Sequence, residues 1–278
     1  MRFIRLFMKN KLGLIGAGFL AIFCIVATSP SFFAPQDPNL MNVKTILQPP
    51  SREYLLGTDE VGRGILSRVI YGDRISLLVG FAAAGLSTII GVMVGIIAGY
   101  YGGRVGESLM RVTDLFIAIP RLPLMLVLAA IVGPSIWNII LIIGLLLWTQ
   151  VARIVRAKTL SVREYPFIER SKAIGCSDLR IMAVHILPNV VPLILANAVL
   201  LIGTAIYYEV TVSFLGLGDP THISWGMILH SAFSSVAVMH RAYWYVIPPG
   251  LAIVLTVLSF TFVGHALDEV LNPKLRER

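Results

Sequence analysis

The sequence predicts an all-α membrane protein with six transmembrane helices, and composition and patterning both support this fold class. Hydrophobic residues make up 56% of the 278 residues and charged residues only 14%, whereas an ordinary soluble domain carries about 25% charged residues. The mean hydropathy is +0.82. Several apolar runs reach the roughly 20 residues that a helix needs to cross a bilayer core of about 30 Å. A large soluble core is a much poorer explanation.

Six apolar runs, taken in order along the chain, define the expected spans. The first follows a basic stretch, as a signal peptide does, but it is longer than a signal-peptide core and lacks an Ala-x-Ala cleavage site, so we expect a retained anchor. The third is interrupted by Pro120 and Pro123, and the fourth is short for a straight span. The runs are Leu12–Phe33, Ser76–Tyr100, Met110–Gly133, Ile136–Val151, Val190–Val212 and Tyr243–His265.

The lysines and arginines predict the orientation of these spans. With a cytoplasmic N-terminus, sixteen of them lie in cytoplasmic segments, six lie in outer segments, and Arg121 lies inside a span. Cytoplasmic loops of membrane proteins carry such an excess, so both termini are expected in the cytoplasm. The net charge of +8 is then explained by topology, and no nucleic-acid partner is expected. The cytoplasmic segments are 1–12, 101–111, 152–189 and 266–278, and the outer segments are 34–75 and 213–242.

We expect the chain to lie in the cytoplasmic membrane, and the expected spans divide it into four parts. They are the cytoplasmic N-terminus with the first helix (1–33), an extracytoplasmic segment (34–75), a core of five helices (76–270) and a cytoplasmic tail (271–278). The core contains a long cytoplasmic loop, residues 152–189. Loops of this length in a compact protein are usually functional.

Several chemistries find no support in the sequence. No G-x-x-x-x-G-K-[ST] string occurs, so any ATP must bind another chain. No G-x-S-x-G string occurs either, and we expect no catalytic residues. The five histidines lack metal-binding spacing, and the two cysteines, Cys24 and Cys176, form no zinc framework, so no metal site is expected.

Ionisable residues inside apolar runs are costly and are therefore candidates for function. Asp114 and Arg121 are seven residues apart, which places them on one face if the helix stays regular. One possibility is that they line a translocation path, where Arg121 could contact a substrate carboxylate or pair with Asp114. The other is that they form hydrogen bonds with each other or with backbone carbonyl groups that the proline kink leaves without a partner. Glu209 follows two tyrosines and is either hydrated at the interface or lines the outer gate. Gly91 and Gly95 predict close helix contact, within the chain or with a partner.

The loop 152–189 contains the pattern of a short amphipathic helix. Pro166 suits a first helical turn, and Gly175 allows a backbone reversal that a Cβ would hinder. A second helical stretch, Leu179–Leu187, leads to Pro188, where we expect the chain to re-enter the membrane. Such a helix can dock into a groove of a soluble partner or lie on the bilayer surface, and the pattern fits both.

Within this loop, Glu169, Gly175 and the pair Leu187-Pro188 resemble the EAA loop of bacterial binding-protein-dependent ABC importer permeases. Arg170 and Ser171 depart from that pattern, since both stand where alanine is usual. Further strings are similar to the peptide and nickel subgroup, and most closely to the second permease of dipeptide and oligopeptide systems. These strings are Leu56–Arg63, Ser67–Gly72, Ser213–Gly218, Ser224–Gly226 and Pro249–Ile253.

The resemblance implies a type I importer fold and a set of partners. These are a homologous permease that forms a heterodimer with this chain, two cytoplasmic ATPases that bind ATP and Mg²⁺, and an extracytoplasmic solute-binding protein. This chain itself would hold no cofactor. The implied substrates are dipeptides or oligopeptides, with nickel, a nickel chelate or sugar oligomers as alternatives. The implied ATPase-coupling residues are Glu169, Arg170, Ser171, Gly175, Leu187 and Pro188.

A transporter that works without ATPases is a distant alternative. Its mark would be broken helices at matching positions in two inverted halves. Only the third apolar run is clearly interrupted, so this alternative finds little support.

Overall fold

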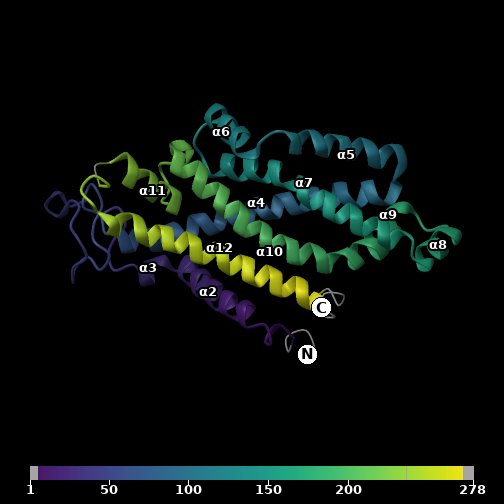
Figure 1. Ribbon diagram of the computed structural model, residues 1–278, viewed down its shortest axis with the longest axis horizontal. Helices are drawn as coiled ribbons and strands as arrows, with labels where there is room; N and C mark the ends of the chain where they lie inside the picture. The colour runs from purple at the N-terminus through teal and green to yellow at the C-terminus, as the bar shows by residue number, and fades with distance from the viewer. Residues whose placement is uncertain (1–5, 236, 272–278) are drawn as a thin grey trace.

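The computed structural model describes residues 6–235 and 237–271, and this part of the chain is mostly helical, with no named strand. Residues 1–5 and 272–278, expected to be cytoplasmic, lie outside the described residues. Figure 1 shows an elongated bundle in which the long helices run side by side. The elements are α2 (Lys11–Thr28), α3 (Pro30–Phe33), η1 (Val43–Thr45), α4 (Ile65–Tyr101), α5 (Gly103–Ala118), α6 (Arg121–Val132), α7 (Ile136–Arg163), α8 (Pro166–Ala173), α9 (Asp178–Arg180), η2 (Ile181–Ile186), α10 (Leu187–Val212), η3 (Ser213–Leu217), α11 (Trp225–Ser234) and α12 (Tyr243–Leu271).

Within the described residues, five helices are long and apolar enough to cross a membrane, and the bent pair α5 and α6 makes six if it counts as one span. This confirms the multi-pass, all-helical fold class. Figure 1 shows α8 and α9 at one end of the bundle, here named the α8 end. The opposite end, named the α11 end, carries α11 and the segment 34–64. Helix α2 begins, and α12 finishes, on the side towards the α8 end.

Two helices extend beyond their apolar runs. Helix α4 begins at Ile65, well before the apolar run that starts at Ser76. The hydropathy pattern missed these first turns because they contain charged residues. Two of these, Arg68 and Asp73, are only 5% and 2% exposed. Helix α7 continues past Val151 to Arg163, since Arg, Lys, Ala and Leu favour helix as strongly outside the membrane as within it.

The third apolar run is divided into α5 and α6, which meet at an angle of 83°. The break lies at Ile119 and Pro120, both in extended conformation. A residue before proline is disfavoured in helical conformation, because the proline ring crowds its backbone. The expected interruption is therefore present, and it is a sharp bend.

Glycines on one face of α4 bring this helix against α7. A Cβ built on Gly91 would lie 2.5 Å from Val151 Cβ, and one on Gly99 would lie 2.6 Å from Thr159 Cβ. Nearby, the Ser87 hydroxyl donates a hydrogen bond of 2.7 Å to the Gly144 carbonyl oxygen. Small residues allow helix backbones to approach closely in membranes. The close contact predicted at Gly91 and Gly95 therefore lies within the chain.

The segment 34–64 is fastened to the α11 end by polar contacts. Asp59 is fully buried and accepts hydrogen bonds from the backbone of Val61 and Arg63, at 3.0 and 2.8 Å. The Arg63 side chain pairs with the same carboxylate at 2.6 Å. Glu60 accepts a hydrogen bond from the Tyr245 hydroxyl of α12. The Asp59 contacts thus shape a segment of little regular structure, and the bond from Tyr245 holds it against α12.

The contact between α4 and α7 predicts a position-specific cost. The substitution Gly95→Ala would place a Cβ 2.7 Å from the Ala152 carbonyl oxygen and from Val155 Cβ, and overpacking of this kind costs about 1–3 kcal/mol. The control is Gly85→Ala in the same helix, where no atom lies within 4 Å. Unfolding in detergent should show a lower stability for Gly95→Ala and no loss for Gly85→Ala. Equal stabilities would contradict the close contact.

Candidate functional site: a helical hairpin at one end and a buried carboxylate at the other

The hairpin at the α8 end, residues 164–186, consists of α8, a glycine turn and the stretch α9–η2. Pro166 occupies the first turn of α8, as the sequence predicts. Ile168 and Ser171 are buried, and the Ser171 hydroxyl donates to the Phe167 carbonyl oxygen at 2.8 Å. Glu169 and Arg170 are exposed on the other side of the helix. Helix α8 thus presents Glu169 and Arg170 outward and turns Ile168 and Ser171 inward.

The turn after α8 is a Schellman motif built on Gly175. This residue has a φ of 78°, and its N–H donates to the Lys172 carbonyl oxygen at 3.0 Å. The Cys176 N–H donates to the Ser171 carbonyl oxygen, also at 3.0 Å. A Cβ on Gly175 would meet nothing within 4 Å. The turn therefore requires glycine for its backbone conformation and not for lack of space, which confirms the expected reversal.

The hairpin is tied to the end of α4. The Tyr100 hydroxyl donates a hydrogen bond of 2.5 Å to Asp178, and Lys172 Nζ lies 5.1 Å from the centre of the Tyr100 ring. On the other side, Arg163 donates to the Tyr100 carbonyl oxygen at 3.2 Å. Sequence analysis did not single out Tyr100 or Asp178, because they are 78 positions apart and belong to no common motif.

The hairpin continues into α10 without a break. The segment Asp178–Leu217 forms one helical span, and the Leu187 N–H donates to the Met182 carbonyl oxygen across a π-turn. Pro188 has no N–H to donate and would crowd a regular helix before it. The wider turn η2 accommodates the proline within a continuous helix, and re-entry into the membrane at Pro188 stays a prediction. Leu187 is half-buried and Pro188 is exposed.

Large apolar side chains are exposed on the hairpin. Ile174 is 79% exposed and Leu179 is 75% exposed, and both flank the Gly175 turn. Figure 1 shows α8 beyond the ends of the long helices. Apolar side chains grouped with charged ones at such a protruding position are typical of a protein interaction site.

At the α11 end, Glu209 of α10 is buried, with 1% of its surface exposed. Its carboxylate accepts hydrogen bonds from the Ser76 hydroxyl of α4 at 3.1 Å and the Ser213 hydroxyl of η3 at 2.9 Å. Ser224, at the start of α11, contributes a third hydroxyl. The alternative in which Glu209 is hydrated at the membrane interface is therefore wrong for this conformation. The carboxylate joins four elements, and a role in an outer gate stays a prediction.

Asp114 and Arg121 do not share a face, because the bend between α5 and α6 separates them. Asp114 instead forms an ion pair with Arg153 of α7, and both side chains are about half exposed. These two residues and Arg156 line a hollow of about 340 Å³. Arg121 forms no ion pair with any described residue. The alternative in which Asp114 pairs with Arg121 is therefore wrong, and Arg153 is the partner that sequence analysis missed.

The Glu209 cluster predicts a graded response to substitution. Glu209→Leu would leave the hydroxyls of Ser76, Ser213 and Ser224 without their acceptor, and an unsatisfied buried polar group costs about 1–3 kcal/mol. Glu209→Gln keeps one carbonyl acceptor, so it should cost less. Unfolding in detergent measures both. Equal losses for the two variants would show that the hydrogen bonds contribute nothing to stability.

Comparison with known proteins agrees with this architecture. A family model described as the binding-protein-dependent transport system inner membrane component matches residues 91–277. A second model, the N-terminal TM domain of oligopeptide transport permease C, matches residues 1–50.

Individual relatives match almost the whole chain. A dipeptide transport system permease protein of Alkalihalophilus pseudofirmus is 37% identical, over 96% of this chain and 88% of the relative. One of Haemophilus influenzae is 36% identical, over 98% and 93%. An oligopeptide transport system permease protein of Bacillus subtilis is 34% identical, over 98% and 88%.

One solved structure shares the fold. A chain from inward-facing conformations of the MetNI methionine ABC transporter aligns with a TM-score of 0.57 and 20% identity, and the alignment covers 75% of this chain and 97% of the other. At that identity the likeness concerns the fold alone. The family model and the relatives carry the assignment: this chain belongs to the family of binding-protein-dependent transport system inner membrane components.

Proposed function

We propose that this chain is a permease subunit of an ATP-driven importer that moves dipeptides or oligopeptides across the cytoplasmic membrane. The substrate class rests on relatives named as dipeptide and oligopeptide permeases, which are 34–37% identical over nearly the whole chain. No G-x-x-x-x-G-K-[ST] string occurs in the sequence, so ATP and Mg²⁺ would be bound by separate ATPase subunits. The chain itself would perform no catalysis.

The observation that carries the coupling proposal is the attachment of the hairpin 164–186. Its start continues from α7, its end continues into α10, and Tyr100 ties its middle to α4. A force applied to α8 would therefore reach three membrane-spanning helices at once. In this proposal Glu169 and Arg170 contact the ATPase, while Ser171 and Gly175 fix the shape of the hairpin. Leu187 and Pro188 begin the helix that receives the motion.

The proposed orientation places the α8 end in the cytoplasm. The hairpin carries Arg170, Lys172 and Arg180, and at the same end Lys9 precedes α2 and Lys11 is its first residue. An excess of Lys and Arg marks the cytoplasmic side. The α11 end would then face outward, where a solute-binding protein delivers the substrate.

A second, homologous permease would complete the path across the membrane. Asp114, Arg153 and Arg121 would line this path, because charged groups in membrane-spanning segments favour a water-filled cavity. Glu209 would lie at the outer gate, where the hydroxyls of Ser76 and Ser213 hold it in this conformation.

The function is tested by reconstitution. We expect the chain with its sister permease, two ATPases and the binding protein to accumulate a labelled dipeptide in proteoliposomes, in an ATP-dependent manner. Omitting the ATPases should abolish uptake, because the chain has no energy source of its own. Uptake by the purified chain alone would contradict the proposal.

The coupling role of the hairpin predicts a difference between two variants of Gly175. A β-branched side chain at a left-handed φ costs roughly 1–2 kcal/mol, whereas Asn tolerates this conformation. Gly175→Val should therefore assemble and hydrolyse ATP but transport severalfold less peptide per ATP, and Gly175→Asn should transport nearly as the unchanged chain does. Uptake and hydrolysis are measured on the same proteoliposomes. An unchanged ratio for Gly175→Val would count against the coupling role.

A further inference from the structure

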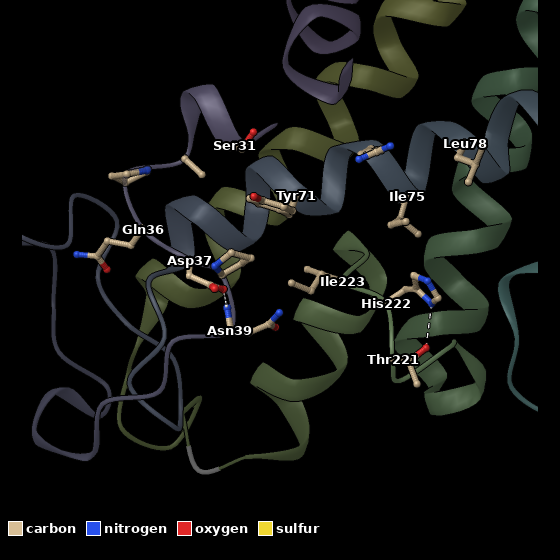
Figure 2. Close-up of a pocket in the computed structure, with 14 residues that line it drawn as sticks. Ser31, Gln36, Asp37, Asn39, Tyr71, Ile75, Leu78, Thr221, His222 and Ile223 are labelled. Carbon is tan, nitrogen blue, oxygen red and sulfur yellow. Dashed lines mark hydrogen bonds between the residues drawn. The ribbon is translucent and has the colours of Figure 1, made fainter. Parts of the chain in front are cut away.

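A pocket of about 850 Å³ opens at the α11 end, within the size range of small-molecule sites. Three segments that are distant in the sequence build it: the loop after α3, the first turns of α4 and the loop before α11. Figure 2 shows Asp37 on one side of the pocket, His222 on the other and Ile223 between them in this view. Tyr71 and Ile75 of α4 complete a largely apolar floor.

The pocket contains one cation and one anion that do not pair with each other. Arg74 of α4 lines it and forms no ion pair with any described residue. Asp37 accepts a hydrogen bond of 2.8 Å from the Asn39 backbone N–H, and no described cation pairs with its carboxylate. Two opposite charges on separate elements therefore remain available above an apolar surface.

The wall of the pocket beside His222 is held in place by Asp219. The Asp219 carboxylate accepts hydrogen bonds from the Thr221 backbone at 2.9 Å and from the first N–H of α7, at Ile136, at 3.2 Å. His222 Nδ1 lies 3.1 Å from the same carboxylate. Burial raises the pKa of Asp219, but the hydrogen bonds outweigh burial and hold the pKa below its ordinary value. This anchor is therefore ionised and present at neutral pH, and is lost only as the pH falls through that lowered pKa.

The pocket also adjoins the Glu209 cluster. Ile75 and His222 line both the pocket and a small cavity beside Glu209 and Ser213. The pocket and the cavity beside the buried carboxylate thus share part of their walls. The position suits a site that is occupied before the gate opens.

We propose that the pocket is an entry subsite for the charged ends of a peptide, with Arg74 binding the α-carboxylate and Asp37 binding the α-ammonium group. Peptides that differ in every side chain still share two charged termini and a backbone. A site that accepts many sequences must recognise those shared groups, and charge-assisted hydrogen bonds are the stronger means of doing so. The apolar floor of Tyr71, Ile75 and Ile223 accepts side chains without demanding a particular one. This inference rests on the proposed peptide function.

The test measures peptide binding at the pocket in the complex of both permeases and the ATPases, without the binding protein. A fluorophore is attached at Ser31→Cys, which lines the pocket, after Cys24 and Cys176 are replaced by serine. The complex in nanodiscs is titrated with Ala-Ala, with its C-terminal amide and with its N-acetyl form. The variants are Arg74→Gln and Asp37→Asn, and the controls are Arg52→Gln and Glu53→Gln, two exposed charges outside the pocket.

The expected result is a crossed pattern. Arg74→Gln should weaken binding of Ala-Ala and its N-acetyl form about tenfold, and leave the amide unchanged, because one charge-assisted contact is lost. Asp37→Asn should weaken Ala-Ala and the amide about tenfold, and leave the N-acetyl form unchanged. The two control variants should bind all three peptides as the unchanged chain does.

Two results would overturn the subsite. One is peptide binding that is absent or insensitive to both variants. The other is Arg74→Gln that leaves peptide binding unchanged but lowers retention of phosphatidylglycerol in native mass spectrometry, which would make Arg74 a lipid anchor. In either case, ATP-dependent dipeptide uptake by the complete complex would show that the proposed function still holds. Absence of that uptake would instead remove the function on which the subsite rests.

Discussion

The close contact of α4 with α7 is the constraint on which the rest of the structure depends. Gly91, Gly95 and Gly99 let α4 approach the backbone of α7 over much of its length. A helix pair in such close contact has little room to slide or tilt, since protein interiors are packed as densely as organic crystals. Helix α4 therefore acts as a rigid strut between the two ends of the molecule.

Both candidate sites are attached to this strut. At the α8 end, Tyr100 holds the hairpin through Asp178. At the α11 end, Ser76 holds the buried Glu209, and Arg74 lies in the entry pocket. At the α11 end, the segments that change partners in transport would then be those held by side-chain hydrogen bonds rather than by close backbone contact. The Glu209 carboxylate makes such hydrogen bonds, because the hydroxyls of Ser76, Ser213 and Ser224, on separate elements, converge on it.

The sequence predicted the long apolar elements well and the polar contacts poorly. The all-helical membrane fold, the bend at Pro120 and the reversal at Gly175 follow from local chemistry that one stretch of sequence contains. The start of α4 does not, because Arg68 and Asp73 are charged residues that tertiary contacts bury. The pairing of Asp114 with Arg153 and the burial of Glu209 depend on which helices become neighbours, and no spacing rule contains that information. The π-turn before Pro188 was not foreseen, because it relieves a conflict that proline usually creates in a helix.

The central claim is that the α8 hairpin and α4 move as one body. The most direct measurement is the distance between spin labels at Ile89 of α4 and Ala173 of α8, both exposed, in the assembled complex with and without bound ATP. The account predicts that this distance stays constant while the distance from Ala173 to the sister permease changes. A change in the distance between Ile89 and Ala173 on ATP binding would contradict it.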